Sequence, residues 1–182
     1  MATESETGGR LAGLPLAPAA GAGLGAWLAT YLFTYLLAAS EIQNSIIGQF
    51  TDIPTWKAVG WIVFNAHFVN AVVEIPLVGG TANFVGGEDG FTALLYVLPP
   101  VLLLVAGLAV GRAGGVEGGS TESAALAGAA VAVGYGAASA VGVLVFPTEN
   151  VSVDPVTGVL LAGVVYPLVF GAIGAVAAHA TG

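Results

Sequence analysis

The chain has 182 residues, of which 57% are hydrophobic and 8% are charged, and 3 Lys+Arg stand against 11 Asp+Glu for a net charge of −8. In soluble domains roughly a quarter of the residues are charged. The low charge of this chain and its mean hydropathy of +0.93 therefore predict an all-α integral membrane helical bundle. Three basic residues exclude binding of nucleic acid by phosphate neutralisation. The absence of Cys excludes disulfides and thiolate metal sites.

Residues 1–15 are small and polar, and we expect a flexible N-terminal tail. Four apolar runs follow, each of about the 20 residues that a helix needs to cross a bilayer: 16–39, 91–110, 124–146 and 156–178. Pro99 and Pro100 predict a kink in the second of these runs. We expect one transmembrane helical domain over 16–179, with 180–182 as a short C-terminal end.

The segment from Ser40 to Ile53 differs from the runs on either side. Ile42, Ile46, Phe50 and Ile53 recur at helical spacing between polar residues, and Ser40 with Gln43 fits a capping box. We predict a short amphipathic helix at the membrane interface. A structured loop outside the membrane is the alternative.

Residues 56–75 form a fifth run, the most polar of the candidates, and a Gly-rich loop over 76–90 follows it. The run is long enough to cross, which predicts five transmembrane helices. In the alternative, four spans are joined by a re-entrant or external polar helix. The bias of Lys and Arg toward the cytoplasm places the loop 111–123 inside and the turn 147–155 outside in both cases; the N-terminus is outside with five spans and inside with four.

Polar side chains gather in this fifth run. His67, Asn70 and Glu74 fall at i, i+3 and i+7, so on a helix they share a face. One hypothesis is a proton or ion relay with His67 titrating near neutral pH and Glu74 as its acidic partner. The other is that Asn65, His67 and Asn70 hydrogen-bond to neighbouring helices or loops. We expect hydroxyl groups of the first span to be packing partners for this face: Thr30, Thr34, Tyr31 and Tyr35.

Patterns of catalysis and metal binding are missing. The other histidine, His179, is far along the chain, and neither an HxxxH nor an ExxH pair accompanies it. The serines lack a nearby base and a GxSxG turn, and the Gly-rich stretches lack the Lys of a phosphate-binding loop. We therefore expect no enzyme, no metal and no cofactor. The triplet that begins at Asn150 is a possible glycosylation acceptor, in agreement with an external turn.

Small residues recur at four-residue spacing in the apolar runs, which lets helix backbones approach closely. The glycines of these ridges are Gly21, Gly25, Gly107, Gly111, Gly128, Gly136, Gly163 and Gly171. They predict packing within one subunit, contacts between subunits, or grooves that hold lipid or isoprenoid chains.

The acidic excess, the single Lys and the Ala/Gly/Val-rich runs resemble a membrane protein of an extremely halophilic archaeon. The stretch Trp56-Lys57-Ala58-Val59-Gly60-Trp61, followed by Phe64-Asn65-Ala66-His67-Phe68-Val69, is similar to a segment of uncharacterised multi-pass membrane proteins of haloarchaea. This resemblance implies no activity and no site residues.

These observations predict a small multi-pass protein of the cell membrane that works by association. Its partners are then membrane lipids and either further copies of itself or other subunits of a membrane complex. Transport of protons or small solutes through the His67 face is the first alternative. Binding of a lipid, quinone or carotenoid in the glycine grooves is the second.

Overall fold

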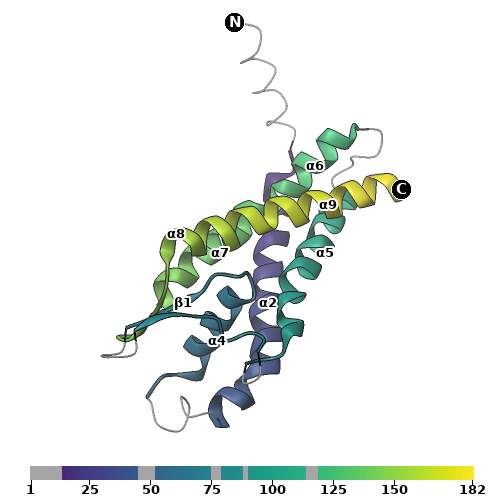
Figure 1. The fold of residues 1–182 in the computed structure, drawn as a ribbon. Helices are drawn as coiled ribbons and strands as arrows, with labels where there is room; N and C mark the ends of the chain where they lie inside the picture. Colours follow the sequence, from purple (N-terminus) through teal and green to yellow (C-terminus); the bar gives the residue numbers. More distant parts are fainter. Residues whose placement is uncertain (1–13, 45–51, 75–78, 88–89, 114–118) are drawn as a thin grey trace, which may run out of the picture.

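The computed structural model describes residues 14–44, 52–74, 79–87, 90–113 and 119–182. Among these residues, four helical segments are long and apolar enough to cross a membrane: Leu16–Asn44, Ala93–Ala113, Thr121–Val145 and Pro155–Thr181. They pack against one another, with the strands and α4 toward one end of the bundle and the C-terminus toward the other (Figure 1). The predicted helical class is confirmed, with a small sheet in addition. The tail expected over 1–15 lies outside the described residues except for Leu14 and Pro15.

The first long helix, α2 (Leu16–Asn44), buries a single stripe of side chains. Its members recur every three or four residues: Ala19, Gly23, Ala26, Thr30, Thr34, Ala38 and Ile42. The helix runs past Ser40, so Ser40 does not begin a separate helix as the capping pattern predicted. Tertiary packing of Ala38 and Ile42 continues the stripe and carries the helix through this residue. Residues 45–51 of the expected interfacial helix lie outside the described residues.

Residues 56–75 do not form one continuous helix. The helix α4 (Thr55–Asn65) has 11 residues, about 16 Å at 1.5 Å per residue, against roughly 30 Å of hydrocarbon. It ends where Phe68 takes the left-handed conformation with φ 60°. The Val69 N–H donates to the Phe64 carbonyl at 3.1 Å and the Phe68 N–H to the Asn65 carbonyl at 2.9 Å, which closes the helix by a Schellman pattern. The expected fifth span is thus corrected to the alternative of four long helices and a short polar one.

The double proline lies at the start of a helix. A 3₁₀ turn, η1 (Ala93–Tyr96), leads into α5 (Leu98–Ala113). Pro99 and Pro100 are the second and third residues of α5, where a missing N–H costs no intrahelical hydrogen bond. They therefore mark the change from 3₁₀ to α geometry, and the kink expected inside the run becomes a helix start.

The last two long segments are each interrupted. Helices α6 (Thr121–Ala129) and α7 (Val131–Val145) meet at Ala130. The final segment passes from α8 (Pro155–Thr157) through a π-helix, η2 (Gly158–Val165), into α9 (Tyr166–Thr181). Pro167 lacks an N–H, and its ring would crowd a carbonyl one turn earlier in α geometry, so the wide turns of η2 precede it.

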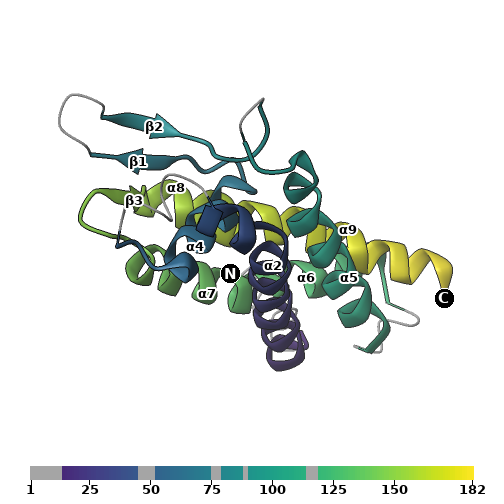
Figure 2. The same ribbon diagram turned by 90° about the horizontal axis from the view of Figure 1, so that it is seen from below.

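Three short strands form an antiparallel sheet in the order β2-β1-β3. They are β1 (Ala71–Val73), β2 (Gly80–Ala82) and β3 (Val151–Val153). Val72 of β1 lies opposite Thr81 on one side and Ser152 on the other, and Figure 2 shows the sheet to one side of the helices. An all-α fold was expected, but the turn 147–155 and the loop 76–90 each supply a strand. We call α4, the turn after it and these strands the cap (residues 52–74, 79–82 and 147–154).

The outer surface of the long helices is apolar. Large exposed side chains occur on each of them, among them Leu36 at 67%, Val105 at 58%, Leu144 at 79% and Ile173 at 51% exposed. A surface of this kind suits hydrocarbon around the helices and would be costly in water.

Candidate functional site

The four predicted polar residues separate into two environments. Asn65 and His67 are completely buried, at 0% exposed, while Asn70 and Glu74 are exposed. Asn65 ends α4, His67 lies in the turn after it, and Glu74 follows β1. Because the helix stops at Asn65, the face that was to join His67, Asn70 and Glu74 is not formed.

His67 sits in a chain of hydrogen bonds between the cap and the long helices. Its Nδ1 lies 2.7 Å from the Val63 carbonyl, which can only accept, so Nδ1 carries the proton. Nε2 lies 2.8 Å from the Tyr135 hydroxyl, and in this tautomer Tyr135 donates to it. The Tyr135 oxygen is also 3.4 Å from Thr30 Oγ1, but neither hydroxyl has a proton left for this contact, because Thr30 donates to the Ala26 carbonyl at 2.8 Å. Thr30 of the first span therefore contacts Tyr135 and does not reach His67 directly.

The surroundings of His67 favour its neutral form. Burial removes the ring from water and lowers the pKa of His67 from 6.5 to about 4, while the bond to the Val63 carbonyl opposes part of that shift. The Tyr166 ring packs edge-on against the imidazole, with centroids 4.9 Å apart. At neutral pH the His67 ring is therefore uncharged, and with both nitrogens hydrogen-bonded it acts as a structural connection.

Asn65 holds the cap together. Its Nδ2 donates to the Val69 carbonyl at 2.8 Å, and its Oδ1 accepts from the Phe84 N–H at 2.8 Å. The Asn65 carbonyl also accepts from Asn83 Nδ2 at 3.4 Å. One side chain thereby joins the end of α4 to the segment after β2, which supports the structural hypothesis for this residue.

Sequence reasoning missed Tyr135 and Tyr166 as partners of His67. Tyr135 stands in a run of small apolar residues, where an isolated tyrosine is an unusual polar group. That isolation was the available signal, since a buried Tyr hydroxyl normally has a partner.

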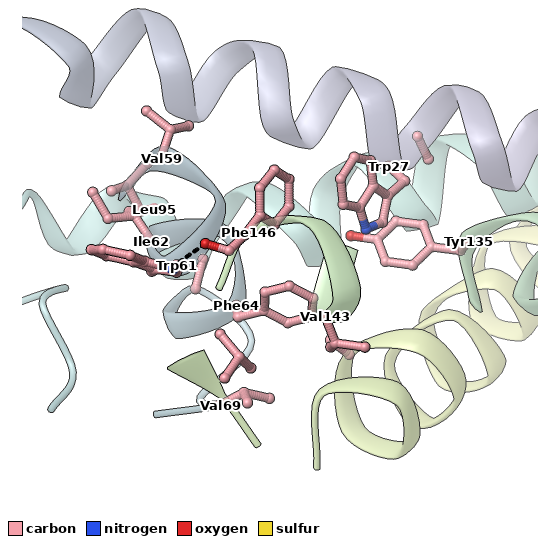
Figure 3. Close-up of a cluster of buried hydrophobic side chains, with 14 of the residues drawn as sticks. Trp27, Val59, Trp61, Ile62, Phe64, Val69, Leu95, Tyr135, Val143 and Phe146 are labelled. Atoms are coloured by element: carbon pink, nitrogen blue, oxygen red, sulfur yellow. Dashed lines mark hydrogen bonds between the residues drawn. The ribbon is translucent and has the colours of Figure 1, made fainter. Parts of the chain in front are cut away.

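A second feature is an aromatic groove between α2 and the end of α7, with a volume of about 380 Å³. Its lining residues are aliphatic or aromatic: Leu24, Trp27, Leu28, Tyr31, Ala138, Val141, Gly142, Val145 and Phe146. The rings of Trp27 and Tyr31 are each within 4° of parallel to Phe146, at 6.2 and 5.7 Å. Phe146 is held by its own carbonyl, which accepts from Trp61 Nε1 at 3.0 Å (Figure 3).

Lys57 stands at one end of this groove. Its Nζ donates to the carbonyl of Pro147, the residue after Phe146, at 2.7 Å, and lies 5.5 Å from the centre of the Trp56 ring. Tyr31 also reaches this point, since its hydroxyl donates to the Trp56 carbonyl at 3.0 Å. Among the described residues no carboxylate pairs with Lys57.

Most of the predicted glycine ridges pack inside the chain. A methyl group on Gly107 or Gly128 would overlap the Gly171 carbonyl. Similar close contacts with other helices surround the rest of this set: Gly111, Gly136, Gly163 and Gly171. Gly21 and Gly25 differ, because a methyl group on either would meet nothing within 4 Å. The helix-packing prediction thus divides into an internal set of six and an outward pair.

Two further predicted features can be placed. Asn150 is exposed beside β3, and its carbonyl accepts from the Glu74 N–H at 2.8 Å; its glycosylation stays a prediction. Within the described ranges, no three His, Asp or Glu side chains gather as metal ligands would.

These features define a class: a helical protein with four segments able to cross a membrane, an apolar outer surface, and a small cap hydrogen-bonded to the bundle through His67. The chain belongs to the DUF7978 family, a family of unknown function whose model matches residues 1–182. Neither a curated protein nor a solved structure matches the chain.

Proposed function

We propose that the protein is a four-span membrane protein that works by association, through the outer face of α2, with a second copy or with another membrane subunit. The observation that carries this proposal is the outward pair Gly21 and Gly25, a Gly-x-x-x-Gly spacing at which an added methyl group would meet none of the described residues within 4 Å. In spanning helices this spacing lets a partner helix approach closely. The six other ridge glycines are already in use within the fold.

The position of the pair on α2 supports an external partner. At 100° per residue, Gly21 and Gly25 lie on the side of the helix opposite the buried stripe that contains Gly23 and Thr30. Leu32 and Leu36 continue this outward face and are 55% and 67% exposed. A partner helix seated there would gain close backbone contact flanked by leucine side chains.

The test is the mass of the assembly in mild detergent and in lipid nanodiscs. We expect the parent chain to run as an oligomer or with a stoichiometric partner, and Gly21→Leu/Gly25→Leu to reduce it to a monomer. The matched control is Ala177→Leu, which adds the same side chain at an exposed position of α9. A monomeric parent without a partner, or an unchanged assembly in the double variant, would refute the proposal.

The proposed orientation places the loop 111–123 in the cytoplasm and the turn 147–155 outside the cell. Because the chain has no Cys, single cysteines report the side without background. Thr121→Cys and Glu149→Cys replace exposed residues at opposite ends of the bundle. A membrane-impermeant maleimide added to cells should label the second and not the first, and the reverse pattern would invert the topology.

Transport of protons or small solutes is the second candidate. It is favoured by the line of His67, Tyr135 and Thr30, whose polar groups lie 2.8 and 3.4 Å apart in the interior. Proton flux in reconstituted vesicles should then fall in Thr30→Val, which keeps the side-chain shape. Equal flux in vesicles with and without the parent protein would exclude this candidate.

A further inference from the structure

The aromatic groove is shaped for a hydrocarbon chain. It lies on two helices that are long and apolar enough to cross a membrane, and its volume of about 380 Å³ falls within the range of ligand pockets. The rings of Trp27, Tyr31 and Phe146, which are nearly parallel to one another, form an aromatic wall of the groove. Gly142 lies among them, and a methyl group there would come within 3.1 to 3.2 Å of the rings of Phe146, Phe64 and Trp27. These rings therefore pack closely against Gly142, and this contact fixes the position of the aromatic wall.

The end of the groove carries a positive charge, and two of its three donors have no partner among the described residues. Lys57 Nζ donates one N–H to the Pro147 carbonyl, and an ammonium group has three. Among the described residues it forms no ion pair, although the chain carries 11 acidic residues against 3 basic ones. Of the basic residues that the structure describes, Lys57 is the one at the cap end, because Arg112 lies in the last turn of α5.

The depth of this end suits a lipid headgroup. Phe146 directly follows the apolar helical segment Thr121–Val145, and the exposed residues Glu149 and Asn150 come soon after it. Tyr31 and Trp56 contact Phe146, so this end of the groove lies at the end of a segment able to cross a membrane, where Tyr and Trp gather in membrane proteins. A lysine at this level extends its ammonium group toward the lipid phosphates.

We propose that the aromatic groove and Lys57 together form a binding site for an anionic phospholipid of the surrounding membrane. One acyl or isoprenoid chain of the lipid lies along Trp27, Tyr31 and Phe146. Its phosphate accepts hydrogen bonds from the Lys57 N–H groups that have no partner among the described residues. The aromatic part of this site, Trp27 and Tyr31, lies on the side of α2 that faces α7, whereas Gly21 and Gly25 lie on the outward face; Leu28 borders both surfaces.

The experiment compares two lipids that differ in headgroup charge. The purified protein is exchanged into detergent with phosphatidylglycerol or phosphatidylcholine of equal chain length, and retained lipid is counted by native mass spectrometry. We expect the parent to prefer phosphatidylglycerol by about fivefold, the effect of one cation near a headgroup. Lys57→Met should lose this preference and still retain lipid, and Lys57→Arg should keep it. Arg112→Met is the control for loss of a positive charge elsewhere.

A second pair of variants tests the groove itself. Val141 lines the groove and is 58% exposed, whereas Val133 is on the same helix, is 57% exposed and lies outside the groove. Val141→Trp should displace both lipids, and Val133→Trp should leave retention unchanged. Equal retention of the two lipids by the parent, a preference that survives in Lys57→Met, or equal retention by the two Trp variants would overturn the proposal. A change in assembly mass in Val141→Trp without loss of lipid would likewise overturn it, by assigning the groove to a protein partner.

Discussion

Replacing Tyr135 by Phe removes one oxygen atom from the middle of the bundle and leaves the ring in place. The Tyr135 side chain is 0% exposed, and its hydroxyl donates to Nε2 of His67, which is also 0% exposed. Without the hydroxyl, Nε2 becomes a buried acceptor with no donor. An unsatisfied buried group of this kind costs about 1–3 kcal/mol.

Tyr31→Phe is the matched control, because it also removes one tyrosine hydroxyl and leaves the ring in place. The Tyr31 hydroxyl also donates one hydrogen bond, to the Trp56 carbonyl at 3.0 Å, but in an exposed setting. There other donors can replace it, so the loss should be about 0.5 kcal/mol. In a chain of 182 residues, 1 kcal/mol shifts the unfolding midpoint by about 2–4 °C. For a cost of about 2 kcal/mol, the middle of its range, we expect a fall of about 4–8 °C for Tyr135→Phe, and of at most about 2 °C for Tyr31→Phe.

The assay is thermal unfolding in one detergent, followed by near-ultraviolet circular dichroism. Adding His67→Phe to Tyr135→Phe removes the stranded acceptor as well, so the double variant should lose less stability than the sum of the two single variants. Equal midpoints for Tyr135→Phe and Tyr31→Phe would show that the bond between Tyr135 and His67 does not connect the cap to the bundle.

The pKa of His67 is about 4 in the folded chain and about 6.5 when unfolded, so the unfolded state binds the extra proton between these values. The free energy of unfolding should be at its full value above pH 6.5 and fall by about 3 kcal/mol as the pH is lowered toward 4. When denaturation is measured at a series of pH values, the free energy of unfolding should fall less with decreasing pH in His67→Gln than in the parent. In Gly107→Leu the new side chain overlaps the Gly171 carbonyl, so we expect a loss of about 3 kcal/mol, whereas Ala177→Leu, at an exposed position of α9, should unfold like the parent; equal midpoints would contradict the helix contact. In Asn65→Ala the two side-chain bonds to Val69 and Phe84 are lost, at a cost of about 2–3 kcal/mol. Hydrogen exchange at the Phe84 amide should then be faster, and unchanged exchange would show that Asn65 does not hold this segment.

The long apolar helices were predictable because their signal is local. A run without charges over about 20 residues needs no partner to be recognised, and the predicted runs correspond to the four helical segments in the structure. Their details were less accessible, since Ser40 has a capping pattern and yet lies inside α2. The packing of Ala38 and Ile42 decided that point, and packing depends on residues far along the chain.

The end of α4 shows why the cap was missed. Helices usually stop at Gly in the left-handed conformation, and here that position is taken by Phe68 with φ 60°. A left-handed Phe costs roughly 1–2 kcal/mol. Its ring stacks on Tyr96 at 4.4 Å between centroids, which offsets part of that cost. The stop signal therefore depended on a contact with a residue 28 positions away.

Composition alone determined that the chain is helical and that its surface suits a membrane, because 57% hydrophobic and 8% charged residues leave few other solutions. The spacing of small residues also indicated close helix packing. Only the tertiary structure decided which glycines face inward, that His67 joins Tyr135 and not Glu74, and that Lys57 stands beside an aromatic groove. These depend on which faces of distant segments meet, and helical periodicity defines a face without naming what lies opposite.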